Sequence, residues 1–263
     1  MKRNKYALYE EAVQTPEAHA LTFGLIYAEL KGKKASVFRE DFCGTFQISC
    51  EWIRAKETNR ALALDLDSEP LNYGKKNNLT KLNSDEKKRL KVSRKNVISV
   101  TAPKADIVGA CNFSFYILKE REVLLKYFKA VLRSLNKNGI MILEMGGGPG
   151  FIHKIKERRS VNEKRTGKFT YIWDQKSFDP ITHDAKYGIH FKFPDGSIMQ
   201  DAFTYDWRLW TIPEIRDVAL EAGFKDFHVY WETSYKGEGT GQYARMKHGD
   251  NAFSWVAYVA AEK

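Results

Sequence analysis

Apolar segments of strand length alternate with helical segments between residues 35 and 145. The strand-like segments are ASVFRED, RALALDLD, LKVSRKNVISV, ADIVGACNFSFYIL and IMILEM. The helical segment before the last of these, at 119–139, repeats apolar residues at helical spacing and ends at Gly139. Strands that alternate with helices in this way usually pair in parallel through right-handed crossovers. The sequence therefore predicts an α/β fold, with a mostly parallel sheet and helices on both of its faces.

The pattern of predicted elements changes on either side of this region. Residues 1–34 read as a helical cap. Residues 151–210 hold three strand-like segments and a PDG turn signal, which predict a small antiparallel β insertion that acts as a lid. A helix at 211–224 and closing strands at 227–232 and 254–263 complete the pattern. We expect a single domain over residues 1–263, with the cap and the insertion as parts of it.

Several classes of protein are disfavoured by composition. The sequence lacks a run of about 18 apolar residues, which a membrane helix needs, and it lacks the apolar core of a secretory signal near its start. We therefore expect a cytoplasmic protein that does not enter a membrane. Three cysteines do not make a disulfide framework, and no cysteine or histidine spacing predicts a metal site. Nothing in the sequence sets the oligomeric state.

The net charge of +10 raises the question of a nucleic-acid partner. Much of the excess lies in one segment, residues 75–95, which has no aromatic residue. Single-strand binders usually combine basic residues with aromatic side chains on which bases stack. We therefore favour a solvated helix and linker here, and keep binding of nucleic acid as the alternative.

The residues expected at the carboxyl ends of the strands favour a nucleoside ligand. Ligands of open α/β sheets bind at this edge. Asp65 follows Gly44 by 21 residues and ends the second strand, where a carboxylate can accept both ribose hydroxyls. A dinucleotide would need G-x-G-x-x-G for close approach of its pyrophosphate, and here Gly44 is flanked by Phe42 and Phe46. A nicotinamide oxidoreductase is thus a distant alternative, and a nucleoside without phosphates fits better.

With these segments in this order, the chain resembles the class I S-adenosylmethionine-dependent methyltransferases. The resemblance runs through REDFCGTFQIS, ALALDLD, RKNVISV, ADIVGACNFSFYIL and NKNGIMILEM. The segments YALYEEAVQTPEA, REDFCGT, YIWDQ and FTYDWRLWTIPE look more narrowly like one bacterial subfamily. The resemblance implies a Rossmann-like methyltransferase sheet with an antiparallel last strand, and S-adenosyl-L-methionine as the cofactor.

The resemblance also implies roles for individual residues. Glu40 takes the acidic position of the first motif, and Phe42, Gly44 and Phe46 take the positions of its three glycines. Asp65 should bind the ribose. The other residues expected at the cofactor are Gln14, Arg39, Cys43, Thr45, Leu66, Asn96, Val97 and Asn112. We expect Arg39 to pair with the cofactor carboxylate, because a guanidinium binds a carboxylate with two hydrogen bonds.

Methyl transfer needs few catalytic groups, because the cofactor supplies the leaving group and the protein mainly positions the acceptor. Candidates near the methyl are Tyr9, Asn112 and Tyr116, and candidates for acceptor binding are Trp173, Tyr205, Arg208 and Trp210. The favoured function is methylation of a small molecule by in-line displacement. The alternatives are an RNA or protein methyltransferase that uses residues 75–95, and a nucleoside-binding module without catalysis.

Overall fold

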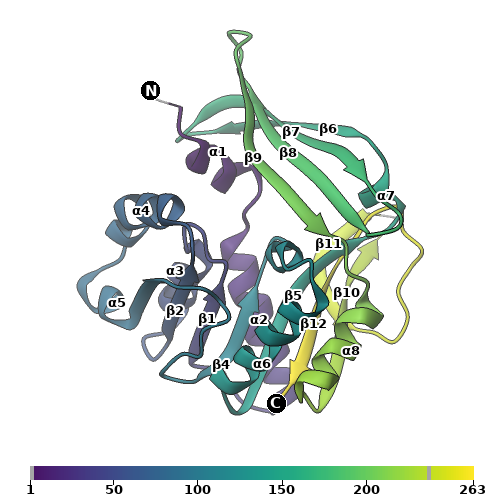
Figure 1. The fold of residues 1–263 in the computed structure, drawn as a ribbon. Coiled ribbons are helices and arrows are strands. Elements are labelled where there is room, and N and C mark those ends of the chain that lie inside the picture. Colours follow the sequence, from purple (N-terminus) through teal and green to yellow (C-terminus); the bar gives the residue numbers. More distant parts are fainter. Residues whose placement is uncertain (1–2, 236–237) are drawn as a thin grey trace.

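The computed structural model describes residues 3–235 and 238–263 and contains two sheets (Figure 1). The larger sheet has eight strands in the order β11-β10-β12-β5-β4-β1-β2-β3. Its bounds are β1 Val37–Asp41, β2 Arg60–Asp65, β3 Leu90–Arg94, β4 Ala105–Ala110, β5 Leu135–Gly147, β10 Asp226–Tyr235, β11 Glu238–Arg245 and β12 Trp255–Glu262. Strands β1 to β5 pair in parallel, whereas β12 lies antiparallel between β5 and β10. This confirms the predicted mostly parallel sheet with an antiparallel last strand.

The strand order reverses between β1 and β4, which are direct neighbours. The chain runs from β1 through β2 to β3 on one side, then crosses back to β4 and β5 on the other. The loops after β1 and β4 therefore diverge at the carboxyl edge and leave a crevice between them. This is the position at which open α/β sheets bind their ligands.

Helices cover both faces of the larger sheet, as predicted. On one face, α2 (Pro16–Lys31), α3 (Gln47–Ala55) and α4 (Ser68–Asn77) close one core cluster. On the other face, α6 (Arg121–Ser134) and α8 (Ile212–Ala222) close a second cluster. The remaining short helices are α1 Lys5–Ala12, α5 Ser84–Arg89, α7 Pro149–Ile152 and the 3-10 turns η1 Leu79–Lys81 and η2 Ser114–Ile117.

The smaller sheet lies over the carboxyl edge of the larger one, with α1 beside it (Figure 1). Its four antiparallel strands have the order β6-β7-β8-β9 and comprise β6 Lys156–Glu163, β7 Gly167–Phe178, β8 Asp184–Lys192 and β9 Ile198–Arg208. Gly196 has a φ of 84° in the turn between β8 and β9, where the PDG signal stands. Apolar residues of α1 and of this sheet share a third core cluster.

Two strands were not expected from the sequence, and the helix predicted at 119–139 ends at Ser134, because β5 already begins at Leu135. β6 has the sequence KERRSVNE and β11 the sequence EGTGQYAR, and neither shows an apolar alternation. Both are edge strands, which have a hydrogen-bonded neighbour on one side only and commonly carry polar side chains. α5 is a short polar helix of 6 residues with a capping box on Asn83, and it lies in the basic segment, where a solvated helix and linker were favoured. Among the described residues, no helix is both long and apolar enough to span a membrane.

Candidate active site

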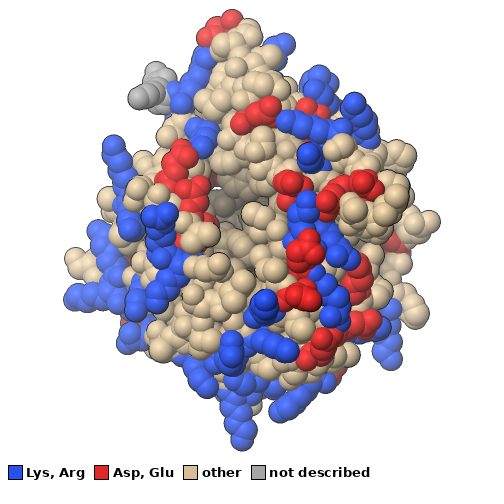
Figure 2. Space-filling view, viewed as in Figure 1, with Lys and Arg blue, Asp and Glu red and all other residues tan. Residues whose placement is uncertain are grey.

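A cavity of about 410 Å³ opens at the crevice between β1 and β4. In Figure 2 the molecule is hollowed near the centre of the face shown, with acidic side chains along one rim. The cavity is formed by α1, the loops after β1, β2 and β4, and the start of β9. Its lining residues are Lys5, Tyr6, Tyr9, Gln14, Glu40, Asp41, Phe42, Cys43, Gly44, Thr45, Ile48, Asp65, Asp67, Pro70, Cys111, Asn112, Ser114, Asp201, Ala202, Phe203, Thr204 and Tyr205.

The turn after β1 keeps a glycine-like backbone with only one glycine. Phe42, Gly44 and Phe46 have φ values of 55°, 53° and 51°, all left-handed. Such a conformation costs a phenylalanine on the order of 1–3 kcal/mol. Phe46 is fully buried, and Gly74 of α4 leaves room for its ring, since a Cβ at Gly74 would lie 2.4 Å from it. Burial of the Phe46 ring thus offsets the backbone strain, and the turn keeps three left-handed residues although only one of them is glycine.

The carboxylate of Asp65 faces this turn. One oxygen accepts a hydrogen bond of 2.7 Å from the backbone N–H of Gly44, and the other accepts one of 2.9 Å from the N–H of Asp67. Burial raises the pKa of Asp65 above its ordinary value, and these two backbone donors act against that rise. The orientation is fixed by the backbone, and each carboxylate oxygen keeps a lone pair for a ligand.

The cavity is rich in carboxyl groups. Five line it, whereas Lys5 is the one cationic side chain among the described lining residues. The carboxyl groups are Glu40, Asp41, Asp65, Asp67 and Asp201. Burial raises the pKa of Glu40 to about 8, although the backbone and hydroxyl of Ser49 both donate to it. Glu40 therefore holds its proton near pH 7, and Asp41 pairs with Arg39. Asp201 pairs with Lys176. Asp65 and Asp67 thus supply the negative charge of the cavity, which favours a cationic ligand and disfavours a diphosphate.

Two buried polar atoms in this cavity lack a hydrogen-bond partner within the described structure: Oε1 of Gln14 and Oγ1 of Thr45. Buried polar groups in folded proteins are nearly always paired, so such atoms indicate a missing ligand or water. Cys43 and Cys111 also line the cavity, and burial raises the pKa of both thiols well above the ordinary value. Neither thiol is therefore an activated nucleophile.

Helix α1 lines the cavity and forms hydrogen bonds both with the smaller sheet and with the segment after α4. Arg165, on the turn between β6 and β7, donates hydrogen bonds to Glu10, Glu11 and the carbonyl of Ala7. The other carboxylate oxygen of Glu10 accepts a hydrogen bond of 2.7 Å from the side-chain amide of Asn78, which follows α4. Glu10 thus joins the smaller sheet to the main body through α1.

A second cavity of about 250 Å³, here called the aromatic chamber, adjoins the first. Tyr9, Asn112 and Tyr205 line both cavities and form the boundary between them. The other lining residues of the aromatic chamber are Val13, Phe113, Phe151, Glu157, Tyr171, Trp173, Gln175, Ile189, Trp207, Ser254 and Val256. The catalytic roles expected for Tyr9 and Asn112 stay a prediction.

Arg39 and Tyr116, which were expected at the site, lie in the core and line neither cavity. Arg39 is fully buried, and its guanidinium pairs with Asp41 at 2.7 Å and donates to the carbonyls of Val97 and Ser99. It is therefore not free for a cofactor carboxylate. Tyr116 is also fully buried, and its hydroxyl donates to the carbonyl of Gly146 at 2.8 Å. Both placements contradict the expected roles, because each polar group is satisfied within the core.

Asn96 and Leu66 are exposed and Val97 is buried, and none of the three lines either cavity. Leu66 stands between the lining residues Asp65 and Asp67, whereas Asn96 follows Lys95, whose N–H donates to the carbonyl of Asp65. Contact of these three residues with an adenine stays a prediction. Trp173 and Tyr205 line the aromatic chamber, and their role in acceptor binding stays a prediction. Arg208 points to the opposite face of β9.

Arg208 lies 3.7 Å from the ring centroid of Trp210 and pairs with Glu214. Trp210 is buried and donates from Nε1 to the carbonyl of Leu118. Neither residue lines the aromatic chamber, and their expected role in acceptor binding stays a prediction.

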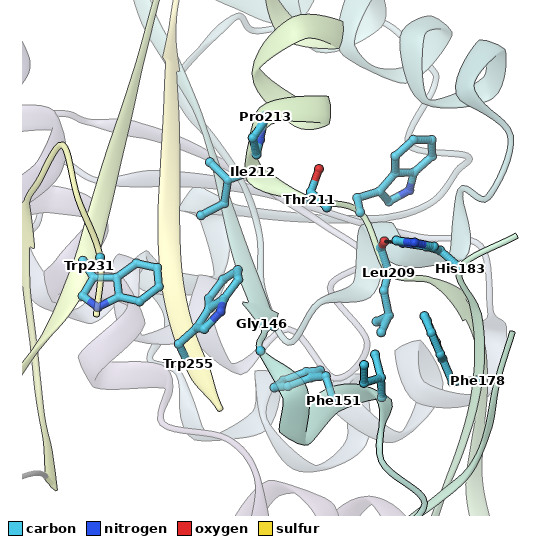
Figure 3. A pocket seen from close by; sticks show the side chains of 15 residues that line it. Gly146, Phe151, Phe178, His183, Leu209, Thr211, Ile212, Pro213, Trp231 and Trp255 are labelled. Carbon is cyan, nitrogen blue, oxygen red and sulfur yellow. Dashed lines mark hydrogen bonds between the residues drawn. The ribbon is translucent and has the colours of Figure 1, made fainter. Parts of the chain in front are cut away.

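Trp210 lines a third cavity, of about 510 Å³, between the end of β5 and the start of α8. Figure 3 shows its walls, where Trp231 and Trp255 stand opposite Leu209, Phe178 and His183. Its walls are mainly apolar, and His183 is the one titratable group among the described residues that line it. This cavity therefore lacks the polar groups that would orient a reacting ligand.

Sequence reasoning missed several residues of the site. Lys5, Tyr6 and Asp67 line the first cavity, and Glu157 and Gln175 line the aromatic chamber. Gln175 could have been found from the sequence, because residues 171, 173 and 175 share one face of β7 and a polar residue on an inward face is unusual. Glu157 had no such signal, because β6 was not expected as a strand.

One group of potential metal ligands includes Cys111, which also lines the first cavity. Ligand atoms of His19, Cys111 and Glu144 lie within 4.8 Å of one another. Nδ1 of His19 lies 2.6 Å from the hydroxyl of Tyr258, and Glu144 accepts from the N–H of Asn112. These protein partners account for His19 and for one oxygen of Glu144 without an ion.

No family model matches the sequence, and no curated protein matches it. Solved structures do match. CalS10 bound to S-adenosylmethionine, an amino pentose methyltransferase from Micromonospora echinaspora, has a TM-score of 0.71 at 14% identity, over 100% of this chain and 98% of that chain. DesVI from Streptomyces venezuelae has a TM-score of 0.69 at 15% identity, over 96% and 95%. An S-adenosylmethionine-dependent methyltransferase from Clostridium acetobutylicum ATCC 824 has a TM-score of 0.68 at 15% identity, over 98% and 98%. The chain therefore has the Rossmann-like methyltransferase fold.

Proposed function

We propose that this protein is an S-adenosylmethionine-dependent methyltransferase that acts on a small-molecule acceptor. One observation carries the proposal: a carboxyl-rich cavity at the strand-order reversal, in which Asp65 is fixed against Gly44. The cofactor carries a sulfonium and an ammonium group, so carboxyl groups attract it, whereas they repel the pyrophosphate of a dinucleotide. The fold supports the same conclusion, since CalS10 and the Clostridium protein are methyltransferases by name.

The residues present fit this cofactor. Asp65 keeps lone pairs for two ribose hydroxyls, and Oε1 of Gln14 and Oγ1 of Thr45 lack partners in the same cavity. An ammonium group would satisfy Gln14, and it would lower the raised pKa of Glu40 by its positive charge. Gly44 and the left-handed turn let the backbone approach the ligand closely.

When bound, the cofactor supplies a methyl group on a good leaving group. The protein then has to orient the acceptor in line and keep water away. Tyr9 and Asn112 stand at the boundary between the two cavities, where an acceptor would meet the methyl. Burial raises the pKa of Tyr9, so its hydroxyl stays protonated and acts as a hydrogen-bonding group rather than as a base.

The aromatic chamber supports a small acceptor, because about 250 Å³ beneath the smaller sheet does not admit a folded macromolecule. CalS10 is named for an amino pentose, which is of this size class. The alternative of an RNA or protein acceptor has less support. Arg89, in the basic segment, donates to the backbone carbonyls of Ile53, Lys56 and Asn59 and is engaged in holding the fold.

The decisive experiment is calorimetry of the whole protein with S-adenosylmethionine, together with mass spectrometry of ligands that copurify. We expect binding, and loss of binding in Asp65→Ala. Glu57→Gln is the control for a carboxyl change, since Glu57 is exposed in the loop before β2, at the opposite edge of the sheet. Failure of the unaltered protein to bind below millimolar concentrations would favour a non-catalytic module. Unchanged affinity in Asp65→Ala would overturn the ribose assignment.

A further inference from the structure

The walls of the aromatic chamber are formed by one face of the smaller sheet. Side chains alternate across a strand, so Tyr171, Trp173 and Gln175 of β7 face inward together, as do Tyr205 and Trp207 of β9. The ring centroid of Trp173 lies 5.8 Å from that of Tyr205 and 6.3 Å from that of Trp207. Those of Tyr205 and Trp207 are 4.4 Å apart. The three electron-rich rings thus pack against one another and together form one wall of the aromatic chamber.

Two groups that accept hydrogen bonds face the same volume. Glu157 stands opposite Trp173 in the β6–β7 pairing, and its charge contributes to the raised pKa of Tyr171, after burial and Tyr9. Gln175 is buried, and its Oε1 lacks a partner within the described structure. The backbone N–H of Gln175 donates to the carbonyl of Ile155, so the strand is held in place while the amide is left for a ligand.

These features share one electrostatic preference. Ring faces attract cations, a carboxylate attracts cations, and an unpaired amide oxygen needs an N–H or O–H donor. None of the described residues that line the aromatic chamber is a lysine, arginine or histidine. A carboxylate or phosphate group on an acceptor would find no positive partner among these lining residues. A hydroxyl could donate to Glu157 or to Gln175, but it carries no positive charge for the rings and the carboxylate to stabilise.

We infer that the aromatic chamber recognises the methyl acceptor as an amine, held as an ammonium ion by Trp173, Tyr205 and Trp207 and by the carboxylate of Glu157 and Oε1 of Gln175. This inference rests on the proposed function. The ammonium gives one proton to water, and the freed nitrogen lone pair then attacks the methyl carbon. The N–C bond forms as the S–C bond breaks, the bonding pair stays on sulfur, and the positive charge passes to the methylated amine. The rings and Glu157 stabilise that charge before and after transfer.

Binding of small probes tests this recognition without turnover. The whole protein, saturated with S-adenosylhomocysteine, is titrated with cyclohexylamine, cyclohexanol and cyclohexanecarboxylate, which differ in one group. Quenching of tryptophan fluorescence and saturation-transfer NMR report binding. We expect the amine to bind about tenfold more tightly than the alcohol, and the carboxylate to bind more weakly than either. Equal affinity for amine and alcohol, or a preference for the carboxylate, would overturn the inference.

Matched variants assign the preference to these residues. Glu157→Gln should remove most of the preference for the amine, whereas Glu163→Gln, the same change further along β6, should leave it intact. Equal effects of the two would mean that only the general charge of the surface matters, and the assignment to Glu157 would fail.

Gln175→Leu should also weaken binding of the amine, and it should raise the melting temperature of the free protein, because an unpaired buried amide oxygen is removed. A lowered melting temperature would show that the amide is a structural group and would remove it from the recognition site. The titration with S-adenosylmethionine separates the two proposals. Cofactor binding without a preference for the amine refutes only the amine, whereas absence of cofactor binding refutes the methyltransferase.

Discussion

The carboxylate of Asp65 accepts a hydrogen bond of 2.7 Å from the backbone N–H of Gly44. The two residues are 21 positions apart in the sequence and end neighbouring strands of the sheet. The contact ties the end of β2 to the turn after β1, so the proposed anchor for the ribose and the backbone of this turn hold each other in place. Loss of the carboxylate therefore changes the turn as well as the charge.

Cofactor affinity should depend on pH through Asp65. Burial raises the pKa of this carboxyl in the free protein, and ribose hydroxyls donate to its ionised form, so the bound state has the lower pKa. Binding is then full at pH values above the raised pKa and weakens by up to about tenfold for each pH unit below it. Calorimetry over a pH series measures this. Asp65→Asn should bind weakly with a flatter profile, and an equally steep profile in that variant would contradict the prediction.

Glu40 should make the free protein less stable as pH rises. Its folded pKa of about 8 lies above the ordinary value of 4.5, so between these values the folded state holds a proton that the unfolded state has lost. Stability attributable to Glu40 is complete below the lower value and falls by about 1.4 kcal/mol for each pH unit across the window. Denaturant titrations at several pH values should show a smaller slope in Glu40→Gln. An identical slope would show that Glu40 is ionised in the folded protein.

The fit of Phe46 against α4 can be tested with two glycines. A Cβ at Gly74 would lie 2.4 Å from the ring of Phe46 and 2.5 Å from the carbonyl oxygen of Thr45, so Gly74→Ala should destabilise the protein by about 1–3 kcal/mol. The control is Gly24→Ala in α2, where the nearest atom is 3.9 Å away and alanine should stabilise the helix by about 0.5–1 kcal/mol. Thermal unfolding compares them, and equal effects would contradict the described fit.

Arg165 should control how firmly α1 covers the cavity. Arg165→Ala removes hydrogen bonds to Glu10, Glu11 and Ala7, and leaves the buried Glu10 with Asn78 alone. We expect faster amide exchange in α1 and an affinity for S-adenosylmethionine lower by about tenfold. Arg158→Ala, an equal loss of charge on β6, is the control. Exchange in α1 that does not change would show that the apolar contacts of α1 suffice.

The order of strands and helices could be predicted because burial on both faces makes central strands apolar. β6 and β11 could not, since edge strands are held by backbone hydrogen bonds that any side chain permits. The anchor at Asp65 follows from its spacing to Gly44. The placement of Arg39 does not, because its sequence neighbourhood fits both a ligand contact and a buried ion pair with Asp41, and the distinction depends on contacts across the sheet.

The smaller sheet leaves the main body after β5 and returns to it at α8, so most walls of the aromatic chamber come from one uninterrupted stretch of sequence. Most groups around Asp65 come from residues 5–114, although residues 201–205 of β9 line that cavity too. Recombination between related genes could therefore exchange the smaller sheet while Asp65 and the turn after β1 stay the same. Under the proposed function, such an exchange would change the acceptor and keep the residues that hold the ribose.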